Sequence, residues 1–215
     1  MTYIIAMDGP SGSGKSTLSE MLAEKLDIEY LNTGLMYRAV TKRFLDLGIG
    51  HEDGEIIKEE LKDLTLSIEN GKIYLNGEDV SKYLRSDDIT KNVSWVSANK
   101  DVREKLVDLQ RAIAKDTSFI LDGRDIGTVV FPNAKYKFYI TASSRIRALR
   151  RYKQNESDFD IDELEEAIIA RDDYDSKREI SPLKKADDAI LIDNSNLSID
   201  ETIDLILKKM DQHAI

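Results

Sequence analysis

A glycine-rich segment near the N-terminus constrains the fold more than any other feature of the chain. Residues 9–16 read Gly-Pro-Ser-Gly-Ser-Gly-Lys-Ser and match the phosphate-binding pattern G-x-x-x-x-G-K-[ST]. The pattern follows an apolar run at residues 3–7 and precedes a helical stripe that begins at Leu18. Its small residues let successive backbone N–H groups turn toward a phosphate, and the helix start adds partial positive charge. The segment therefore predicts a P-loop between a buried strand and a helix.

The remaining sequence alternates between strand-like and helix-like patterns, which favours an α/β fold built on a parallel sheet. Continuous apolar runs, typical of strands buried on both faces, lie at residues 3–7, 118–121, 136–141 and 189–192. Apolar residues at helical spacing include Leu18, Met21, Leu22 and Leu26, and later Ile199, Ile203, Ile206, Leu207 and Met210. Ser198 and Glu201 have capping-box spacing at the start of the last helix. We expect four buried strands in one central sheet.

Two stretches interrupt this alternation. Residues 64–80 contain two short period-2 segments around an Asn70-Gly71 turn, with a second turn at Asn76-Gly77, and predict a small antiparallel insert. Residues 145–178 are rich in charge and predict two helices joined by a polar turn near residues 155–160. The second stretch has the composition of an exposed, mobile flap.

Composition limits the partners of the chain. Its 215 residues are 41% hydrophobic, enough for one domain with appended lobes, and its net charge of −10 works against binding to nucleic acid or an anionic membrane. The chain has no cysteine, which suits a reducing compartment, and residues 3–7 are too short for a signal peptide. No apolar stretch approaches the roughly 18 residues that a membrane helix needs. We expect a cytoplasmic protein whose anionic ligands are small, and a solvated helix face at residues 55–62.

Within the P-loop, residue chemistry indicates how a nucleoside triphosphate would be held. Lys15 supplies a positive charge for the β- and γ-phosphates, and the Ser16 hydroxyl is a hard oxygen ligand for Mg²⁺. Asp122 ends the buried run at residues 118–121 and is a candidate for the carboxylate that supports the Mg²⁺. Asp122 could instead be a simple turn residue, but its neighbours Arg124 and Asp125 argue for a site.

A P-loop alone is compatible with kinases, switch GTPases and transport ATPases. A GTPase needs an Asn-Lys-x-Asp guanine reader, and residues 99–102 read Asn-Lys-Asp-Val in a helical pattern. A transport ATPase needs a Leu-Ser-Gly-Gly signature, which the sequence lacks. Both classes are therefore disfavoured, and a kinase is the expected class.

The chain resembles bacterial-type cytidylate kinases over essentially its whole length. The blocks that carry the resemblance are residues 8–17, 31–38, 73–80 with 84–85, 94–110, 122–132 and 171–178. The resemblance implies ATP as donor, Mg²⁺ as cofactor and CMP or dCMP as acceptor, in pyrimidine nucleotide metabolism. It also implies a P-loop doubly wound parallel sheet with an inserted monophosphate-binding lobe and a helical lid. The expected division is core at 1–35, 99–144 and 181–215, monophosphate-binding lobe at 36–98, and lid at 145–180.

The resemblance also assigns roles to individual residues. Ser94, Arg103 and Asp125 look like readers of cytosine, Arg38 and Arg124 like clamps on the acceptor phosphate, and Arg171 and Asp175 like ribose ligands. Thr33 and Tyr37 belong to the same acceptor site, and Lys15, Arg124, Arg171 and Arg178 are the expected catalytic residues. The expected ATP site comprises Gly9, Pro10, Ser11, Gly12, Ser13, Gly14, Lys15, Ser16 and Thr17, with Arg150 and Arg151 as weaker candidates from the lid.

These residue types suit the reaction. Cytosine presents an amine donor and two acceptors, which a carboxylate, a hydroxyl and a guanidinium complement. The acceptor phosphate is largely dianionic at neutral pH because its second pKa is about 6, so it needs no general base. Catalysis then consists of aligning two polyanions that repel each other and stabilising the equatorial oxygens with Arg, Lys and Mg²⁺.

Several alternatives stay open at this stage. The acceptor could be UMP, AMP or a non-nucleotide such as shikimate, or the chain could be a regulatory protein that binds nucleotide without transfer. The arginines at positions 145, 147, 150 and 151 could form a solvated helix face paired with nearby acids. His51 and His213 indicate no ligand, and Trp95 and Tyr37 suit packing. Asn32 stands where the family usually has Asp, so no carboxylate role is assigned there. We expect a monomer.

Overall fold

The computed structural model describes residues 2–69, 71–154 and 159–212. Its contacts divide the chain into two compact units, Met1–Leu31 with Asp116–Ile215, and Asn32–Lys115. The predicted division into core, monophosphate-binding lobe and lid stays a prediction; the contact-based units place residues 100–113 in the second unit. Along the described chain, no helix combines the length and the apolar content needed to cross a membrane.

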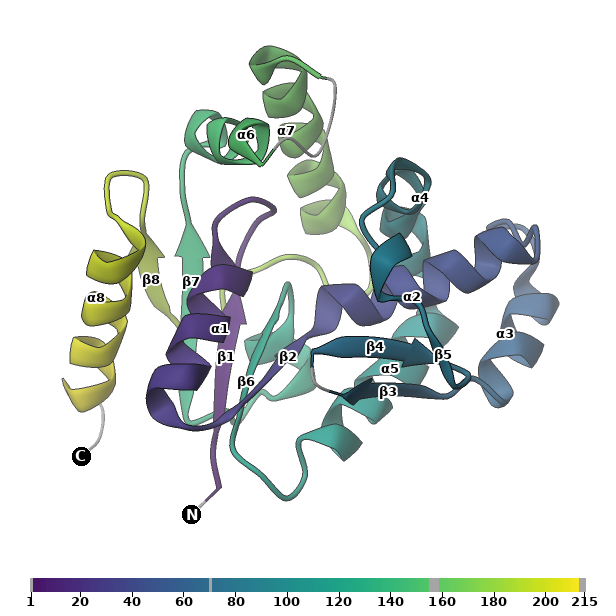
Figure 1. The fold of residues 1–215 in the computed structure, drawn as a ribbon, viewed down its shortest axis with the longest axis horizontal. Coiled ribbons are helices and arrows are strands. Elements are labelled where there is room, and N and C mark those ends of the chain that lie inside the picture. The colour runs from purple at the N-terminus through teal and green to yellow at the C-terminus, as the bar shows by residue number, and fades with distance from the viewer. Residues whose placement is uncertain (1, 70, 155–158, 213–215) are drawn as a thin grey trace. The chain divides into compact units, whose positions relative to one another are not determined.

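The first unit is built on a five-stranded sheet in the order β2-β6-β1-β7-β8 (Figure 1). The pairs β1–β6, β1–β7 and β7–β8 are parallel, so these strands end at one edge of the sheet. Its elements are β1 (Ile4–Asp8), α1 (Lys15–Leu26), β2 (Glu29–Asn32), β6 (Phe119–Gly123), the short π-helical turn η2 (Ile126–Val130), β7 (Tyr136–Thr141), α6 (Ser144–Lys153), α7 (Ile161–Lys177), β8 (Ile190–Asp193) and α8 (Ile199–Gln212).

The four predicted strands are present, but the expectation of four buried strands was wrong in two respects. The sheet has a fifth strand, β2, whose sequence Glu-Tyr-Leu-Asn carries no apolar run and has one buried residue, Leu31. The strand β8 lies at the sheet edge, and its Leu191 is 57% exposed. The presence of β2 in the sheet and the edge position of β8 depend on which strands pair, and the hydrophobic pattern of the sequence does not show the pairing.

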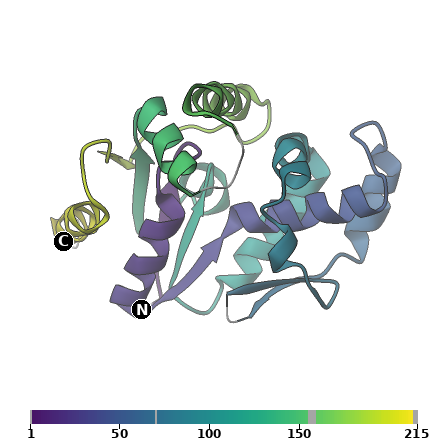
Figure 2. The same cartoon turned by 45° about the horizontal axis from the view of Figure 1, so that its top comes forward.

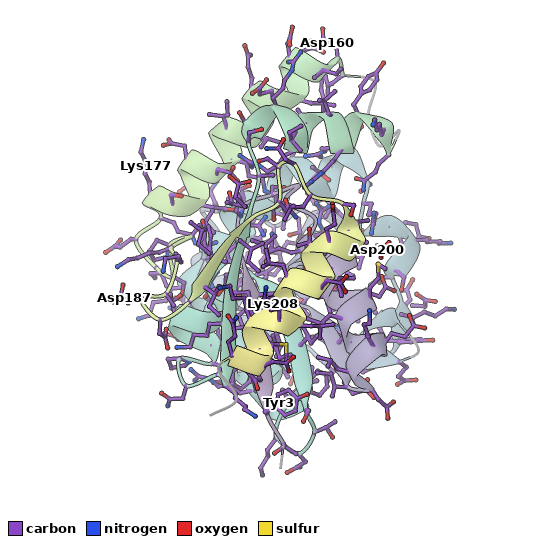
Figure 3. All side chains as sticks on the ribbon, turned by 90° about the vertical axis from the view of Figure 1, so that its left-hand side faces the viewer. Tyr3, Asp160, Lys177, Asp187, Asp200 and Lys208 are labelled. Atoms are coloured by element: carbon purple, nitrogen blue, oxygen red, sulfur yellow. The ribbon has the colours of Figure 1, made fainter. Side chains whose placement is uncertain are left out.

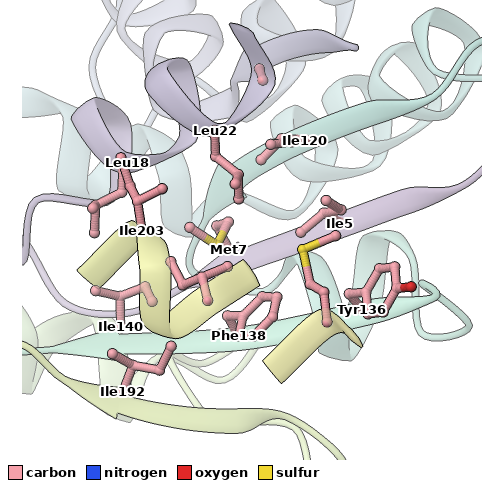
Figure 4. Packing of buried hydrophobic residues seen from close by; sticks show 13 residues of the cluster. Ile5, Met7, Leu18, Leu22, Ile120, Tyr136, Phe138, Ile140, Ile192 and Ile203 are labelled. Atoms are coloured by element: carbon pink, nitrogen blue, oxygen red, sulfur yellow. The ribbon is translucent and has the colours of Figure 1, made fainter. Parts of the chain in front are cut away.

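Helices α1 and α8 share a core with the sheet. Leu18 and Leu22 of α1 and Ile203 of α8 pack with Met7 and Phe138 of the strands (Figure 4). Ser198 and Glu201 form the predicted capping interactions, since Glu201 N donates to Ser198 Oγ and Ser198 N donates to Glu201 Oε2. The opposite face of α8 is polar, as the exposed Asp200 and Lys208 show (Figure 3).

The predicted charged pair of helices, α6 and α7, lies side by side (Figure 2). Ala148, Leu164 and Ile168 form a small core between them. Asp160 caps α7 through a capping box with Glu163. The predicted turn between the helices includes residues 155–158, which lie outside the described residues.

The second unit combines helices with a three-stranded sheet in the order β3-β4-β5. Its elements are α2 (Thr33–Asp46), α3 (Gly54–Lys62), β3 (Leu66–Glu69), β4 (Lys72–Leu75), β5 (Glu78–Asp79), the 3₁₀ turn η1 (Ser81–Tyr83), α4 (Asp87–Ala98) and α5 (Lys100–Ile113). The pairs β3–β4 and β4–β5 are antiparallel, which confirms the predicted insert and adds a short third strand. Asn70 of the first predicted turn lies outside the described residues, as does His213. Trp95 stacks on Phe44 with ring centroids 6.0 Å apart, so its packing role is confirmed.

Candidate active site

The P-loop leaves β1 through backbone conformations that favour glycine. Gly9 has a φ of +144°, and a Cβ atom there would lie 2.0 Å from the carbonyl oxygen of Ile140 on β7. Gly12 and Gly14 have φ angles of +75° and +86°. Because a side chain at Gly9 would collide with the backbone of β7, this glycine lets the loop turn closely over the sheet edge before α1 begins at Lys15.

Lys15 lies almost fully buried at the end of this loop, with 6% of its surface exposed. Its Nζ donates to the Pro10 carbonyl oxygen at 2.7 Å and to Ser13 Oγ at 3.3 Å. Burial and the nearby Arg124 guanidinium lower the pKa of Lys15 to about 7. An anion bound at the loop would favour the charged form, because opposite charges raise the pKa of an ammonium group.

Ser16 and Asp122, the two predicted Mg²⁺ residues, contact each other directly. Ser16 Oγ donates to Asp122 Oδ2 at 2.6 Å, and the Tyr30 hydroxyl donates to Asp122 Oδ1 at 3.2 Å. Burial raises the pKa of the Asp122 carboxyl. Within the described ranges, no three His, Cys, Asp or Glu side chains form a metal-binding group. A hydroxyl and one carboxylate nevertheless fit Mg²⁺, which usually binds one or two protein oxygens together with substrate phosphates and water.

A buried carboxylate on α7 holds two of the predicted catalytic arginines. Asp175 accepts a hydrogen bond from Arg124 Nε at 3.1 Å, and Arg178 Nη1 lies 3.8 Å from its other oxygen. Asp175 and Arg178 have only 5% and 4% of their side chains exposed. Arg171 precedes Asp175 by one helical turn and lies on the same face of α7. Asp125 follows Arg124, is 3% exposed and directly precedes η2.

Arg147 ties α6 to the P-loop and was not among the predicted site residues. Its guanidinium donates to the Ser11 and Ala142 carbonyl oxygens, each at 2.9 Å, and to the Asp172 carboxylate. Asp172 also accepts a hydrogen bond from the Ser11 backbone N–H at 3.2 Å. The interpretation of this arginine cluster as a solvated face is therefore wrong for Arg147, although Arg145 is exposed and pairs with Asp162 and Glu165 as that interpretation expects.

Arg150, one of the two weaker candidates, also reaches the P-loop. It donates to the Ser13 carbonyl oxygen at 3.4 Å, and to the side-chain and main-chain oxygens of Asn194 at 3.0 and 2.8 Å. Asn194 is 3% exposed, and its amide donates to the same Ser13 oxygen at 3.0 Å. Among the described residues Arg151 makes no comparable contact with the loop, so the structure brings Arg150 to the P-loop and leaves Arg151 aside.

The remaining predicted acceptor residues lie in the second unit. Arg38 on α2 donates to the Leu84 carbonyl oxygen at 2.8 Å and to Thr90 Oγ1 at 3.0 Å. These contacts hold its guanidinium against α4 and against the segment that precedes α4. Thr33 is buried at the first position of α2, and Asn32 caps that helix because its side chain accepts a hydrogen bond from Leu35 N. The Asn that replaces the usual Asp thus has a structural contact of its own.

Arg103 is the most deeply buried of the predicted acceptor arginines, with 3% of its surface exposed. It donates to the Ser97 carbonyl oxygen at 2.8 Å, and its guanidinium carbon lies 5.3 Å from the centre of the Tyr37 ring. Ser94 lies on α4, where its carbonyl oxygen accepts from Ser97 Oγ. The second unit therefore brings Tyr37 to Arg103 and places Ser94 one turn before the carbonyl that holds Arg103.

Residues that the sequence analysis left without a role take part in this arrangement, among them Asp8, Tyr30, Arg147, Asp172 and Asn194. Asp8 carries the same signal as Asp122, a carboxylate directly after an apolar run at the end of a buried strand, and that signal could have identified it. Asp172 is adjacent to the predicted Arg171. Asn194 follows the last strand, where parallel sheets place their ligands, but nothing in the local sequence distinguishes it from a turn residue.

Comparison with known proteins identifies close relatives. The family model described as "Cytidylate kinase" matches residues 5–212. A cytidylate kinase from Fusobacterium nucleatum subsp. nucleatum is 45% identical over 212 residues, which cover 97% of each chain. One from Streptococcus pyogenes serotype M6 is 45% identical over 218 residues, covering 97% of this chain and 96% of the relative.

Solved structures of lower identity share the fold. A shikimate kinase from Acinetobacter baumannii, solved with shikimate, has a TM-score of 0.53 at 13% identity and covers 100% of this chain and 96% of its own. A gluconokinase from Sinorhizobium meliloti 1021 has a TM-score of 0.53 at 12% identity, covering 98% and 92%. These similarities bear out the expected α/β P-loop kinase fold, a mostly parallel sheet flanked by helices.

Proposed function

The chain belongs to the cytidylate kinase family, and from this premise we propose how its residues transfer the γ-phosphoryl group of ATP to CMP. The products of this ATP-dependent nucleoside monophosphate kinase are ADP and CDP. We extend the acceptors to dCMP, which gives dCDP, on the resemblance to the family alone.

One observation carries the residue assignment. The P-loop, the Ser16–Asp122 pair and the Arg124–Asp175–Arg178 cluster all belong to one unit and lie after the carboxyl ends of parallel strands or on α7. Ligands of open α/β sheets bind at that edge. A triphosphate held by the loop would therefore place its transferable phosphate near a cluster of cations.

On the donor side, the backbone N–H groups of residues 11–16, at the start of α1, receive the phosphates of ATP. Lys15 exchanges its contacts with Pro10 and Ser13 for phosphoryl oxygens, where its charge stabilises the transition state. Arg150, held by Asn194 beside Ser13, adds positive charge from the lid. We assign Thr17, and Arg151 from α6, to the outer part of the same nucleotide site.

Ser16 and Asp122 are the residues that would hold Mg²⁺. A bound Mg²⁺ would supply positive charge that offsets the negative charge of the phosphates. The Ser16 hydroxyl supplies a neutral oxygen, and Asp122 an anionic one whose orientation is fixed by Ser16 and Tyr30. Ionised Asp122 also balances the positive charge of nearby Lys15.

On the acceptor side, arginines bind an anion that needs no proton removal. The phosphate of CMP is largely dianionic at neutral pH, since its second pKa is about 6. Arg38 and Arg124 bind this phosphate, and Arg171 and Arg178 bring charge from α7 to the group in transfer. Asp175 fixes Arg124 and Arg178 as their carboxylate partner and is also our candidate for the ribose contact, together with Arg171.

Recognition of the base is assigned to three side chains. Asp125 accepts a hydrogen bond from the exocyclic amine of cytosine, while Ser94 and Arg103 bind its acceptor atoms. Tyr37 supports Arg103 through its ring face, and Thr33 completes the acceptor residues. A carboxylate at the amine disfavours uracil, which would present a carbonyl oxygen to it.

The test is an acceptor panel with ADP release as the readout. The wild-type protein should consume ATP only when an acceptor is present, and kcat/KM should favour CMP over UMP by at least about 100-fold, because sites built around a substrate NH reject analogues that lack it. Replacement Asp125→Asn should shrink the CMP/UMP ratio, mainly through lost CMP activity. The replacement Asp187→Asn, at an exposed position, is the matched control.

Two outcomes would contradict the assignment. A CMP/UMP ratio that stays unchanged in Asp125→Asn removes this carboxylate from base recognition. A panel in which UMP, AMP or a non-nucleotide exceeds CMP overturns the acceptor itself.

We also propose that the enzyme acts as a monomer in the cytoplasm. ATP and nucleoside monophosphates are substrates of the cytoplasmic pool. Light scattering at assay concentrations should give the mass of one chain, 24.4 kDa.

A further inference from the structure

Asp8 is a buried carboxylate with an unusual pair of contacts. It ends β1, directly before the P-loop, and is 4% exposed. Its Oδ1 accepts a hydrogen bond from Ile126 N at 2.8 Å, and its Oδ2 accepts one from Gly127 N at 2.7 Å. Both donors belong to the first positions of η2, immediately after Arg124 and Asp125.

The contact depends on close approach of the two segments. A Cβ atom on Gly127 would lie 3.3 Å from Asp8 Oδ2 and 3.2 Å from Cδ of Lys137, so a larger residue would separate the amide from the carboxylate. In the register of the sheet, Asp8 pairs with Gly123, one residue before Arg124. Asp8 is thus joined to both ends of the short segment that carries Arg124 and Asp125.

Retaining a charged group at this position has a free-energy cost. Burial raises the pKa of Asp8 to about 6, although the two backbone N–H groups favour its charged form, and Asp125 adds a further unfavourable charge. A core position that served packing alone would be filled more favourably by an apolar side chain. What the carboxylate provides, and an apolar side chain would not, is a fixed orientation for the two amides of η2.

We infer that Asp8 is a positioning residue for the acceptor side of the reaction. It holds the first turn of η2 so that Asp125 and Arg124 point at the base and phosphate of the acceptor. Since its backbone is continuous with Gly9, Asp8 also fixes this segment relative to the start of the P-loop. The inference deepens the proposed function and rests on the roles given there to Arg124 and Asp125.

The experiment compares kinetic constants for both substrates in variants of the full chain. Asp8→Asn keeps the size but retains a single acceptor oxygen for two N–H donors. We expect the KM for CMP to rise about tenfold, as befits one hydrogen bond to a charged group, with a smaller CMP/UMP ratio and a KM for ATP within about twofold. Gly127→Ala, which disturbs the same contact from the other partner, should give the same signature.

Two further proteins keep the test decisive. Ile5→Val, in the same strand, weakens core packing without touching η2 and should leave the CMP/UMP ratio and both KM values unchanged. If Asp8→Asn does not fold, Asp8→Glu, which keeps the charge but moves the carboxylate by one methylene, takes its place. Hydrogen exchange of the Ile126 and Gly127 amides, expected to be slow in wild type and faster in the variants, reports the contact directly.

Kinetic losses shared equally by CMP, UMP and ATP, with an unchanged acceptor ratio, would overturn the inference and leave Asp8 a purely structural residue. Failure of the proposed function looks different, because wild type would then fail to prefer CMP in the panel. In that event, the acceptor that the panel identifies replaces CMP in the comparison of KM values. A rise in the KM for that acceptor, with an unchanged KM for ATP, then decides the role of Asp8.

Discussion

Helices α3 and α6 are both rich in charged residues, yet their charges meet different surroundings. On α3 the pairs Lys58–Glu55 and Lys62–Glu59 join neighbouring turns of one helix, and all four side chains are at least half exposed. On α6 the Arg147 side chain is 8% exposed and is bound by the P-loop and by Asp172. Exposed pairs contribute about 0–1 kcal/mol, whereas a buried charge must keep its partners. Charge content alone therefore says little about what a helix does.

The same contrast exists within α6. Arg145 lies two residues before Arg147, but it is half exposed and pairs with Asp162 and Glu165 on α7. Two positions on a helix differ by roughly 200°, so the two guanidinium groups leave the axis on nearly opposite sides. Both faces contact α7, through Asp172 on one side and through Asp162 and Glu165 on the other, but only the Arg147 side also holds the P-loop residue Ser11.

The largest expected effect sets Lys15, the buried lysine of the P-loop, against Lys58, an exposed lysine of α3. Lys15→Ala should lower kcat by about 10²–10³-fold, because it removes the charge that we assign to the transferring phosphoryl group. Lys58→Ala should keep kcat within about twofold. Steady-state assays at saturating ATP and CMP measure both, and circular dichroism checks folding. A Lys15→Ala protein with more than about a third of the wild-type kcat would contradict the assignment.

A smaller effect, on the free energy of unfolding, should distinguish Arg147 from Arg43. Arg147→Met removes three contacts of a buried guanidinium and leaves the Asp172 carboxylate without that partner, so the free energy of unfolding should fall by about 3 kcal/mol. Arg43→Met is the matched control, because Arg43 forms a part-exposed pair with Glu60 of α3 and should cost below about 1 kcal/mol. Urea denaturation at neutral pH measures both. Equal losses of unfolding free energy in the two variants would show that the difference in exposure between the ion pairs of α6 and α3 has no effect on stability.

Sequence reasoning predicted the features that local patterns encode. The P-loop, the strand that ends at Asp122, the two charged helices and the capping box at Ser198 each rest on residues within a few positions of one another. The strand β2 was not predicted, because it is stabilised by pairing with β6 and by the burial of a single side chain, Leu31.

Contacts between distant parts of the chain account for what was missed at the site. Asp8 and Ile126 are 118 residues apart, Asn194 and Ser13 are 181 apart, and Arg147 and Asp172 are 25 apart. Asp, Asn and Arg side chains are usually exposed, and for Arg147 this favoured the interpretation as a solvated helix face. In the fold, Asp8, Asn194 and Arg147 each bind a backbone group instead, namely Ile126 N, Ser13 O and Ser11 O.

The smallest expected effect concerns Glu165 of α7, whose contacts resemble those of α3 although it lies in the segment that we propose as the lid. Ser144 Oγ donates to its carboxylate at 2.6 Å, and Arg145 pairs with it at 3.1 Å. The Ser144 hydroxyl and, secondarily, Arg145 hold the pKa of Glu165 below its usual value. A carboxyl group whose pKa is lowered by folding stabilises the protein above its unfolded pKa, near 4.5, and loses that contribution as the pH falls through the folded value.

Glu165→Gln should therefore denature at slightly lower urea concentration than wild type at pH 7, and the difference should disappear as the pH falls below the unfolded value near 4.5. It should also shrink in about 1 M salt, where exposed charges are screened within about 3 Å. Glu166→Gln, at the exposed neighbouring position, is the control for the loss of one negative charge. A large difference in stability that persists at low pH and in high salt would contradict this expectation. It would show that Glu165 forms a buried ion pair like that of Arg147, not an exposed pair like those of α3, because only a desolvated charge pair is insensitive to added salt.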